Sequence, residues 1–216
     1  MVNIAAVIDH TLLKPTATYN DFKKLCDEAV QYGFYSVCVP PFMVESCKKA
    51  LNNADVKVCT VIGFPLGYNS YLTKLIETKQ AIKDGADEID AVINISALKS
   101  KDFSYVEKEI SLLRKTVSDK ILKVIIETAY LDKNEKIKIA QIILDNGVDF
   151  LKTSTGFAPS GANIDDIKLF KKILKNNVKI KASGGISTYE QAQQFIKLGA
   201  NRLGTSKSLQ IITKNE

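Results

Sequence analysis

Histidine is almost absent from the sequence: His10 is the only one among 216 residues. A zinc site built on imidazole ligands needs two or three histidines, so that kind of site is excluded. Any Ser-His or Cys-His catalytic pair would have to use this one residue. We interpret His10, which sits between Asp9 and Thr11, as a hydrogen-bonded structural residue rather than a catalytic base.

Close cysteine pairs and the usual nucleotide-binding loops are absent as well. No two of the four cysteines show C-x-x-C spacing, and neither G-x-x-x-x-G-K-[ST] nor G-x-G-x-x-G occurs. We interpret Cys26, Cys47 and Cys59 as small core residues. We therefore expect no bound metal and no cofactor.

Long apolar runs are missing too. None reaches the roughly 18 residues typical of a membrane-spanning helix, and no charged segment followed by an apolar one opens the chain. We expect a cytoplasmic protein with free thiols and no membrane partner.

Arginine is also scarce, although the net charge is +6. Of the 30 basic residues only Arg114 and Arg202 are arginines, the residue type that binds bases and phosphates bidentately. The lysines are scattered among acidic residues and form no basic stripe. We predict no nucleic-acid partner.

What remains is the composition of an ordinary globular domain. Hydrophobic residues make up 45% and charged residues 25% of the chain, which excludes wholesale disorder. A chain of this length buries roughly 70% of its unfolded surface and needs no disulfide or metal to fold. We predict a single domain over residues 1–216.

Short apolar runs rich in valine and isoleucine alternate with longer amphipathic segments along the whole chain. Such runs, mostly without a polar face, are typical of buried parallel strands. We predict strands at Ile4–Ile8, Tyr35–Val39, Val56–Ile62, Glu88–Ile93, Ile121–Ile126, Val148–Leu151, Val178–Ala182 and Arg202–Gly204. Helical spacing is seen in Phe22, Leu25, Cys26, Ala29 and Val30, and in Ile137, Ala140, Gln141 and Leu144. We predict helix starts near Asn20, Thr73, Asp132, Asp165 and Ser187, with a capping box over Ser187–Glu190.

Eight strand–helix alternations in 216 residues favour a barrel. About 27 residues per unit is near the compact end of the range for this fold. An open, doubly wound sheet is the alternative, but it usually has five or six strands. The predicted fold is a single (β/α)8 TIM barrel of the α/β class.

Polar residues end most of the apolar runs, and in a TIM barrel the active site lies at the carboxyl ends of the strands. These residues are Asp9, Cys38, Thr60, Asp90 with Asn94, Glu127, Lys152, Lys181 and the turn Gly204-Thr205-Ser206. A charge in an apolar wall costs several kcal/mol unless it is paired, so chance does not explain so many.

Lys152 and Lys181 lie on adjacent predicted strands, so their ammonium groups are expected to approach each other. A like charge about 5 Å away disfavours the second charge by about 3 kcal/mol at an effective dielectric constant of about 20. The resulting neutral amine attacks carbonyl groups and forms Schiff bases. The alternative for any single lysine is a solvated surface charge. We interpret Lys179 in that way, whereas Lys123, on the face of Glu127, fits either description.

Asp90 is placed to move protons during imine formation beside the two lysines. The alternative is a structural salt bridge to Lys181, and both roles are compatible. Asp9 is a similar but weaker candidate. Cys38 ends the second predicted strand, and we expect it to face the mouth of the barrel as a substrate-binding residue, although no feature of the sequence indicates an activated thiol there.

Glycine-rich turns follow the last two predicted strands. Gly184-Gly185 precedes one helix start, and Gly204-Thr205-Ser206 opens the last helix. Loops seven and eight of barrels often bind phosphate through backbone N–H groups and a helix N-terminus. Either glycine pair alone fits a tight turn, but together on these loops they favour a phosphate site.

At these residues the chain resembles the deoxyribose-phosphate aldolase family of Schiff-base barrel lyases along nearly its whole length. The matching stretches are IDHTLLKP (8–15), SVCVPP (36–41), VCTVIGFPLG (58–67), ETKQAIKDGADEIDAVINISALKS (77–100), KVIIET (123–128), FLKTSTGF (150–157), KASGGISTYEQA (181–192) and GANRLGTS (199–206). The resemblance implies reversible cleavage of 2-deoxy-D-ribose 5-phosphate to acetaldehyde and D-glyceraldehyde 3-phosphate, in deoxyribonucleoside catabolism.

The resemblance also implies roles for individual residues. Lys152 matches the Schiff-base lysine, Lys181 the second lysine that activates it, and Asp90 the proton-transfer aspartate. Asp9 and Thr11 match positions near the substrate hydroxyls. The residues that match the phosphate-binding turns are Gly156, Gly184, Gly185, Gly204, Thr205 and Ser206.

Three features depart from the family pattern. Some members end in a tyrosine that assists proton transfer, whereas the last tyrosine here is Tyr189, so water or Asp90 is left to protonate the enamine. Ser187 and Lys207 stand where many members carry arginine and serine, which bears on phosphate affinity. Ser96 replaces a usual glycine, a change that we expect to be tolerated.

Two other functions remain open at this point. One is a Schiff-base aldolase for a different phosphorylated sugar, and the other is a phosphosugar-binding barrel in which the lysines merely pair with carboxylates. In each case the partner is a small phosphosugar. We expect a homodimer or a higher homo-oligomer, the common state of such barrels.

Overall fold

Eight parallel strands close into a barrel in chain order in the computed structural model, which describes residues 3–213. The strands are β1 (Ile8–Thr11), β2 (Ser36–Val39), β3 (Lys57–Ile62), β4 (Glu88–Val92), β5 (Ile121–Ile125), β6 (Phe150–Lys152), β7 (Lys179–Ser183) and β8 (Arg202–Thr205). Because β8 pairs with β1, no edge is left open, and the TIM-barrel prediction is confirmed over the doubly wound alternative.

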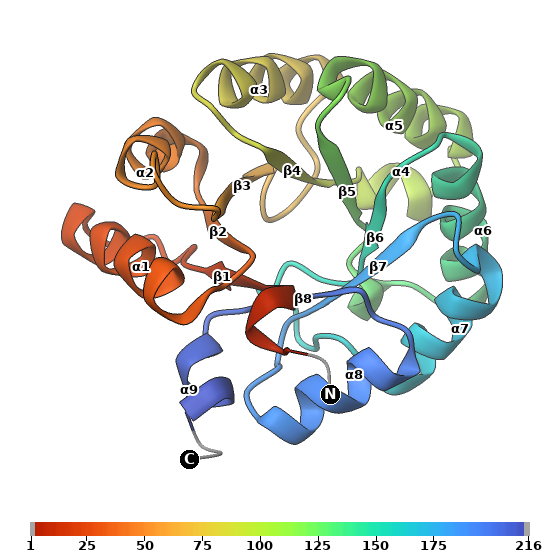
Figure 1. Cartoon of the computed structure of the whole chain (residues 1–216). Helices are drawn as coiled ribbons and strands as arrows, with labels where there is room; N and C mark the ends of the chain where they lie inside the picture. Colours follow the sequence, from red (N-terminus) through yellow and green to blue (C-terminus); the bar gives the residue numbers. More distant parts are fainter. Residues whose placement is uncertain (1–2, 214–216) are drawn as a thin grey trace.

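Helices form an outer ring around the strands (Figure 1). They are α1 (Tyr19–Tyr32), α2 (Val44–Ala50), α3 (Tyr71–Lys83), α4 (Ile95–Lys99), α5 (Phe103–Val117), α6 (Lys133–Asp145), α7 (Ile164–Leu174), α8 (Tyr189–Leu198) and α9 (Ser208–Thr213). Three single turns of 3-10 helix are η1 (Ala5–Val7), η2 (Pro41–Met43) and η3 (Thr128–Tyr130). No helix within residues 3–213 is both long enough and apolar enough to cross a membrane.

The predicted strand at Ile4–Ile8 is wrong. Residues Ala5–Val7 form the turn η1, and β1 begins only at Ile8 and continues through Asp9 to Thr11. Ile4 and Ile8 are both buried in the hydrophobic core, but only Ile8 belongs to the strand. Asp9 consequently lies inside the strand and not beyond its end. Asp90 and Lys181 are likewise internal to their strands.

The helix starts are mostly set by residues near the predicted ones. Asp132 caps α6 as predicted and forms a capping box with Glu135. Elsewhere the capping residues are Thr18, Ser70, Asn163 and Thr188, each accepting a hydrogen bond from the backbone N–H three residues later. The capping box of α8 therefore pairs Thr188 with Gln191, one residue later than predicted.

The apolar faces of the helices pack onto the outside of the barrel. Phe22, Leu25, Cys26 and Ala29 of α1 are buried as predicted, but Val30 is exposed. On α6 the predicted face is also wrong at Ile137, which is exposed. The buried residues of α6 are Ile139, Ala140, Ile142 and Ile143. The helix has apolar residues on two adjacent faces, and the face that carries Ile139, Ile142 and Ile143 is the one that is buried.

Candidate active site

A pocket of about 460 Å³ opens at the carboxyl ends of the strands. Its wall combines the last residues of β1, β6, β7 and β8 with residues from the loops that follow these strands. Among the described residues that line it are three lysines, Lys14, Lys152 and Lys207, and no carboxylate. The pocket is therefore suited to an anionic ligand.

Lys152 is the last residue of β6, and only 4% of its side chain is exposed. Its Nζ lies 2.9 Å from Oδ2 of Asp90, and its side chain also lines the pocket. A ligand in the pocket therefore reaches an amine that is otherwise enclosed by the barrel.

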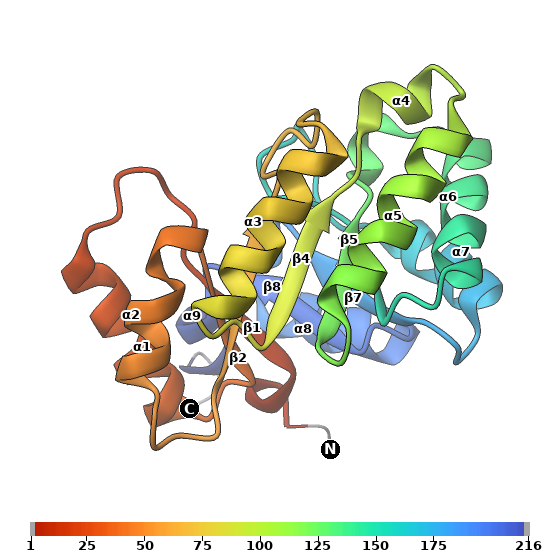
Figure 2. The same cartoon turned by 90° about the horizontal axis from the view of Figure 1, so that it is seen from above.

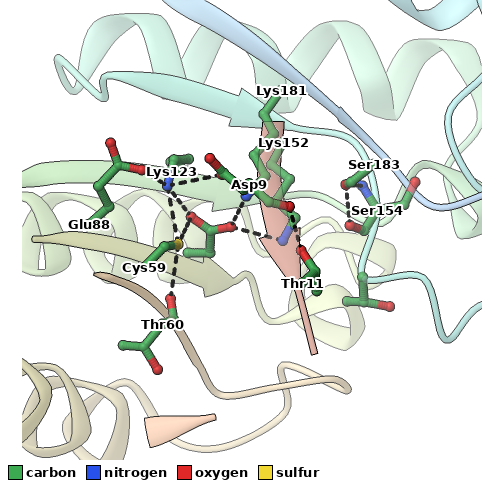
Figure 3. A network of polar contacts seen from close by, with 12 residues as sticks. Asp9, Thr11, Cys59, Thr60, Glu88, Lys123, Lys152, Ser154, Lys181 and Ser183 are labelled. Atoms are coloured by element: carbon green, nitrogen blue, oxygen red, sulfur yellow. Dashed lines mark hydrogen bonds and ion pairs between the residues drawn. The ribbon is translucent and has the colours of Figure 1, made fainter. Parts of the chain in front are cut away.

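Lys181 is the register partner of Lys152 on β7, and the two side chains lie side by side (Figure 3). Its fully buried Nζ donates to Asp9 and, at 2.7 Å, to the same Oδ2 of Asp90. Burial alone would lower the pKa of Lys181, but Asp9 and Asp90 outweigh it and raise the pKa above its usual range. Lys181 is therefore held as a cation, and it lies beside Lys152 on the neighbouring strand.

Asp90 lies at the centre of this arrangement. Its Oδ1 accepts from Lys123 Nζ at 2.7 Å and from Cys59 Sγ at 3.2 Å. Burial raises the pKa of Asp90, but Lys123, Lys152 and Lys181 together bring the pKa well below its ordinary value. Asp90 is thus an ionised carboxylate at neutral pH, able to accept a proton.

Asp9 is fully buried and does not line the pocket. Its Oδ1 accepts from Arg202 at 2.7 Å and from Ser36 at 2.8 Å, and its Oδ2 from Lys181. Burial raises its pKa, and Lys181, Lys123 and Arg202 lower it more. Thr11, two residues further on, does line the pocket, and its Oγ1 donates to the Asp9 carbonyl at 2.9 Å.

Cys38 is fully buried and does not line the pocket either. A hydrogen bond with Cys59 lowers the pKa of the Cys38 thiol to about 7; burial opposes the change, and Lys181 and Lys152 support it. No sequence feature revealed this lowered pKa, because Cys59 is a cross-strand neighbour 21 positions away. Cys38, Cys59 and Asp90 could jointly approach a metal ion, since their ligand atoms lie within 4.8 Å of one another, but lysines already occupy both oxygens of Asp90.

The predicted phosphate turns lie together at one side of the pocket. Gly156, Gly184, Gly185, Gly204, Thr205 and Ser206 all line it. Gly184 and Gly185 have φ values of 84° and 77°, which only glycine adopts readily. A Cβ on Gly204 would lie 2.9 Å from Cε of Lys181, so the absent side chain makes room for that lysine.

His10 is confirmed as a hydrogen-bonded residue. Its Nδ1 pairs with Ser208 Oγ and its Nε2 with Glu28, each at 2.9 Å. Tyr189, the last tyrosine, lies in the first turn of α8 and does not line the pocket. Ser96 is exposed in the helix α4, a conformation that does not require glycine.

Three further charged residues inside the barrel were missed or left open by the sequence reasoning. Lys123, Glu88 and Arg202 are all buried, whereas Lys179 is exposed as predicted. Lys123 Nζ lies 2.5 Å from Glu88 Oε2, and Figure 3 shows it beside Cys59. The only sequence feature that pointed to a buried Lys123 is that it shares one face of the predicted strand with Glu127.

A buried lysine that opens onto a pocket at the carboxyl end of a (β/α)8 barrel, with a carboxylate and a second cation beside it, is the arrangement of a Schiff-base lyase. The comparisons agree with that class. The model of the DeoC/LacD family aldolases matches residues 4–207, and the chain belongs to this family.

Full-length relatives are similar throughout. The chain is 52% identical to the deoxyribose-phosphate aldolase of Caldanaerobacter subterraneus subsp. tengcongensis, over 98% of this chain and 93% of that protein. It is 51% identical to that of Clostridioides difficile, over 100% and 98%. The tetrameric deoxyribose phosphate aldolase from Aeropyrum pernix superposes with a TM-score of 0.87 at 31% identity, covering 96% of this chain and 88% of that one.

Proposed function

We propose that this chain catalyses the reversible cleavage of 2-deoxy-D-ribose 5-phosphate to acetaldehyde and D-glyceraldehyde 3-phosphate, with Lys152 as the Schiff-base residue. The observation that carries the assignment is the position of Lys152. Of the buried lysines within residues 3–213, Lys152 is the one that lines the pocket, and both Asp90 and the neighbouring Lys181 lie behind it. The names of the curated relatives favour this substrate over other phosphorylated sugars.

The reaction follows from these positions. The neutral amine of Lys152 attacks the C1 aldehyde of the open-chain sugar, and loss of water gives a protonated imine. The C3 hydroxyl loses its proton, the C2–C3 bond breaks, and its electron pair moves into the imine to form an enamine. Glyceraldehyde 3-phosphate leaves. Protonation of the enamine at C2 and hydrolysis of the imine then release acetaldehyde and restore Lys152.

Asp90 is the proton carrier in this scheme. Its pKa lies well below the usual value, so it is ionised in the resting enzyme and can accept a proton only transiently. Its Oδ2 contacts both Lys152 and Lys181, so a proton that Asp90 accepts from the carbinolamine nitrogen can be returned to the carbinolamine hydroxyl, which leaves as water.

The phosphate group occupies the glycine-rich side of the pocket. The loops after β7 and β8 supply backbone N–H groups there, and Lys14 and Lys207 supply the charge. Ser187 also lines this side but carries no charge, which leaves Lys14 and Lys207 as its cationic side chains. With the sugar phosphate on this side, the aldehyde end points toward Lys152.

The proposal includes a homo-oligomer in the cytoplasm. A relative from Aeropyrum pernix is described as tetrameric. On this chain Leu66, Tyr68, Leu72 and Ile76, from the loop after β3 and from α3, are exposed large apolar residues. Sedimentation of the purified protein would test the oligomeric state.

The test is borohydride reduction in the presence of 2-deoxyribose 5-phosphate, followed by peptide mass mapping. The expected adduct is on Lys152. An adduct on another lysine would support aldolase activity but contradict the assignment of Lys152 as the Schiff-base residue. Binding of the phosphosugar without any adduct would instead indicate a non-catalytic phosphosugar-binding barrel.

A further inference from the structure

His10 contacts both ends of the turn that follows β8. Its backbone is the register partner of Thr205 in the pairing of β1 with β8. Asp9 points into the barrel, so the next side chain along the strand points outward. There the Nδ1 atom of His10 lies 2.9 Å from Oγ of Ser208, the first residue of α9. One residue of β1 is therefore bonded to the beginning and to the end of the turn 205–208.

The His10 ring is itself held from two sides. Its Nε2 lies 2.9 Å from Oε2 of Glu28 on α1, and its centroid lies 4.8 Å from that of the Phe34 ring. Because the Glu28 carboxylate accepts a hydrogen bond, Nε2 carries a proton and Nδ1 is left to face Ser208. His10 and Phe34 are both buried, which restricts rotation of the imidazole. The ring therefore links α1 to α9 in a fixed orientation.

The middle of the turn has open space on two sides. Ser206 and Lys207 are exposed and line the substrate pocket, and they also line a second cavity of about 620 Å³. His10 and Glu28 line this second cavity and not the substrate pocket. Ser206 and Lys207 thus form a wall between the two cavities. The position of this wall depends on the contacts at the two ends of the turn.

Other hydrogen bonds shape the turn from within. Thr205 Oγ1 donates to the Ile186 carbonyl at 2.7 Å and accepts from the backbone N–H of Lys207 at 2.9 Å. Ser208 Oγ lies 3.2 Å from the Thr205 carbonyl. These bonds join residues of the loops after β7 and β8. The contact between Ser208 and His10 differs from them, because it anchors the far end of the turn to β1.

We propose that His10 is a positioning residue for the phosphate group, because it fixes both ends of the turn 205–208, whose middle faces the bound phosphate. The inference rests on the proposed function, which places the phosphate on this side of the pocket. Backbone N–H groups bind an anion well only when they point at a common position, so a displaced turn binds phosphate less tightly. His10 does not line the substrate pocket, so its loss should affect binding of the phosphate and not the chemistry at Lys152.

Asparagine and glutamine separate the two side-chain bonds of His10. The amide of asparagine reaches about as far as Nδ1, and that of glutamine about as far as Nε2. His10→Asn therefore keeps a partner for Ser208, whereas His10→Gln keeps a partner for Glu28 only. Ser208→Ala removes the contact with His10 from the other side. The matched control is Thr116→Val, which removes a hydroxyl of α5 that donates to the Leu112 carbonyl at 2.9 Å.

The experiment measures kcat and KM for 2-deoxyribose 5-phosphate and for unphosphorylated 2-deoxyribose, together with inhibition by inorganic phosphate. In His10→Gln and Ser208→Ala, the KM for the phosphorylated sugar and the inhibition constant of phosphate should rise roughly five- to tenfold, the effect of about one lost hydrogen bond. The kcat values and the KM for the unphosphorylated sugar should stay within about twofold of the parent. His10→Asn and Thr116→Val should resemble the parent in every measurement.

A purely structural role of His10 would give a different pattern. Lower stability alone would reduce the active fraction, and with it the apparent kcat for both sugars, and would leave each KM in place. Unchanged KM values in Ser208→Ala would overturn the inference, and so would an asparagine variant as impaired as His10→Gln. If His10→Gln does not fold, Ser208→Ala decides.

The same measurements separate this inference from the function on which it rests. A parent protein with equal KM values for the two sugars would overturn the proposed phosphate side, and the role of His10 with it. A borohydride adduct on a lysine other than Lys152, together with the expected KM changes, would refute the Schiff-base assignment and leave the role of His10 standing.

Discussion

Two sets of buried charges in this molecule are built differently. Outside the barrel, Lys74 of α3 pairs with Glu109 of α5 at 2.6 Å, between helices that lie side by side (Figure 2). Lys74 also donates to the carbonyls of Gly67 and Val92, and Glu109 accepts from the backbone N–H of Asn94. In this pair one cation meets one anion, and neither lines the pocket.

The cluster inside the barrel has no such one-to-one match. Burial lowers the pKa of Lys74 and raises that of Glu109, and each is partly restored by its partner. Inside the barrel three cations act on each of Asp9 and Asp90, so the pKa values of these two carboxylates fall despite their burial. The Lys74–Glu109 pair joins two helices and nearby backbone groups, whereas the barrel cluster includes a lysine that opens onto the pocket. The predictions below test this contrast.

The largest effect is expected from Lys152→Ala. Without an amine no imine forms, so kcat should fall on the order of 10⁴-fold or more, while circular dichroism and thermal unfolding stay close to the parent. Lys179→Ala is the control, because Lys179 belongs to the adjacent strand but is exposed at the opposite end of the barrel. Substantial turnover in Lys152→Ala would show that the nucleophile is another residue.

The next largest effect is expected from Lys181→Leu. It removes a cation that shares Oδ2 of Asp90 with Lys152, and a nearby cation is what favours the neutral form of a nucleophilic amine. Activity should fall by roughly 10²- to 10³-fold near neutrality, and what remains should appear at a higher pH. A pH–rate profile checks this, and an unmoved acidic limb would remove the activating role of Lys181.

Lys74→Met should affect stability rather than chemistry. Glu109 would remain buried without its partner, which costs about 3–5 kcal/mol of the free energy of unfolding. Urea unfolding measures the loss. The acidic limb of the pH–rate profile should stay in place, since this pair is not part of the barrel cluster.

Two further variants serve as controls for the stability loss expected in Lys74→Met. Lys48→Met removes a partly exposed lysine that pairs with Asp87 at 2.8 Å, and it should cost less than about 1 kcal/mol. The double variant Lys74→Met with Glu109→Leu should recover part of the lost stability, because the unpaired charge is gone. If the acidic limb of the pH–rate profile shifted in Lys74→Met, the Lys74–Glu109 pair would not be independent of the charged cluster inside the barrel.

The same contrast shows how far sequence reasoning extends. Periodicity predicted the closed barrel, and strand-end polarity brought together Lys152, Lys181 and Asp90. The depth of each charge was not predictable, because it depends on how neighbouring strands are staggered. Asp9 lies deeper than expected because β1 begins late, and Arg202 reaches Glu88 across 114 positions of sequence. The alternation of side chains along one strand indicates which face of the strand a residue lies on. It does not identify the residues of other strands that this side chain contacts across the barrel.

The smallest effect is expected at the pocket rim, where charge is exposed and screened. Lys207 lines the phosphate side of the pocket, and its backbone N–H donates to Thr205 Oγ1 at 2.9 Å. Lys207→Gln keeps that backbone contact and removes only the charge, so KM for 2-deoxyribose 5-phosphate should rise roughly five- to tenfold. Because the charge acts on the phosphate and not on the reacting carbon, kcat should change little, and KM for unphosphorylated 2-deoxyribose should stay the same. Equal increases in both KM values would mean that Lys207 shapes the pocket as a whole. An unchanged KM for the phosphorylated sugar would assign the phosphate to Lys14 and the glycine turns alone.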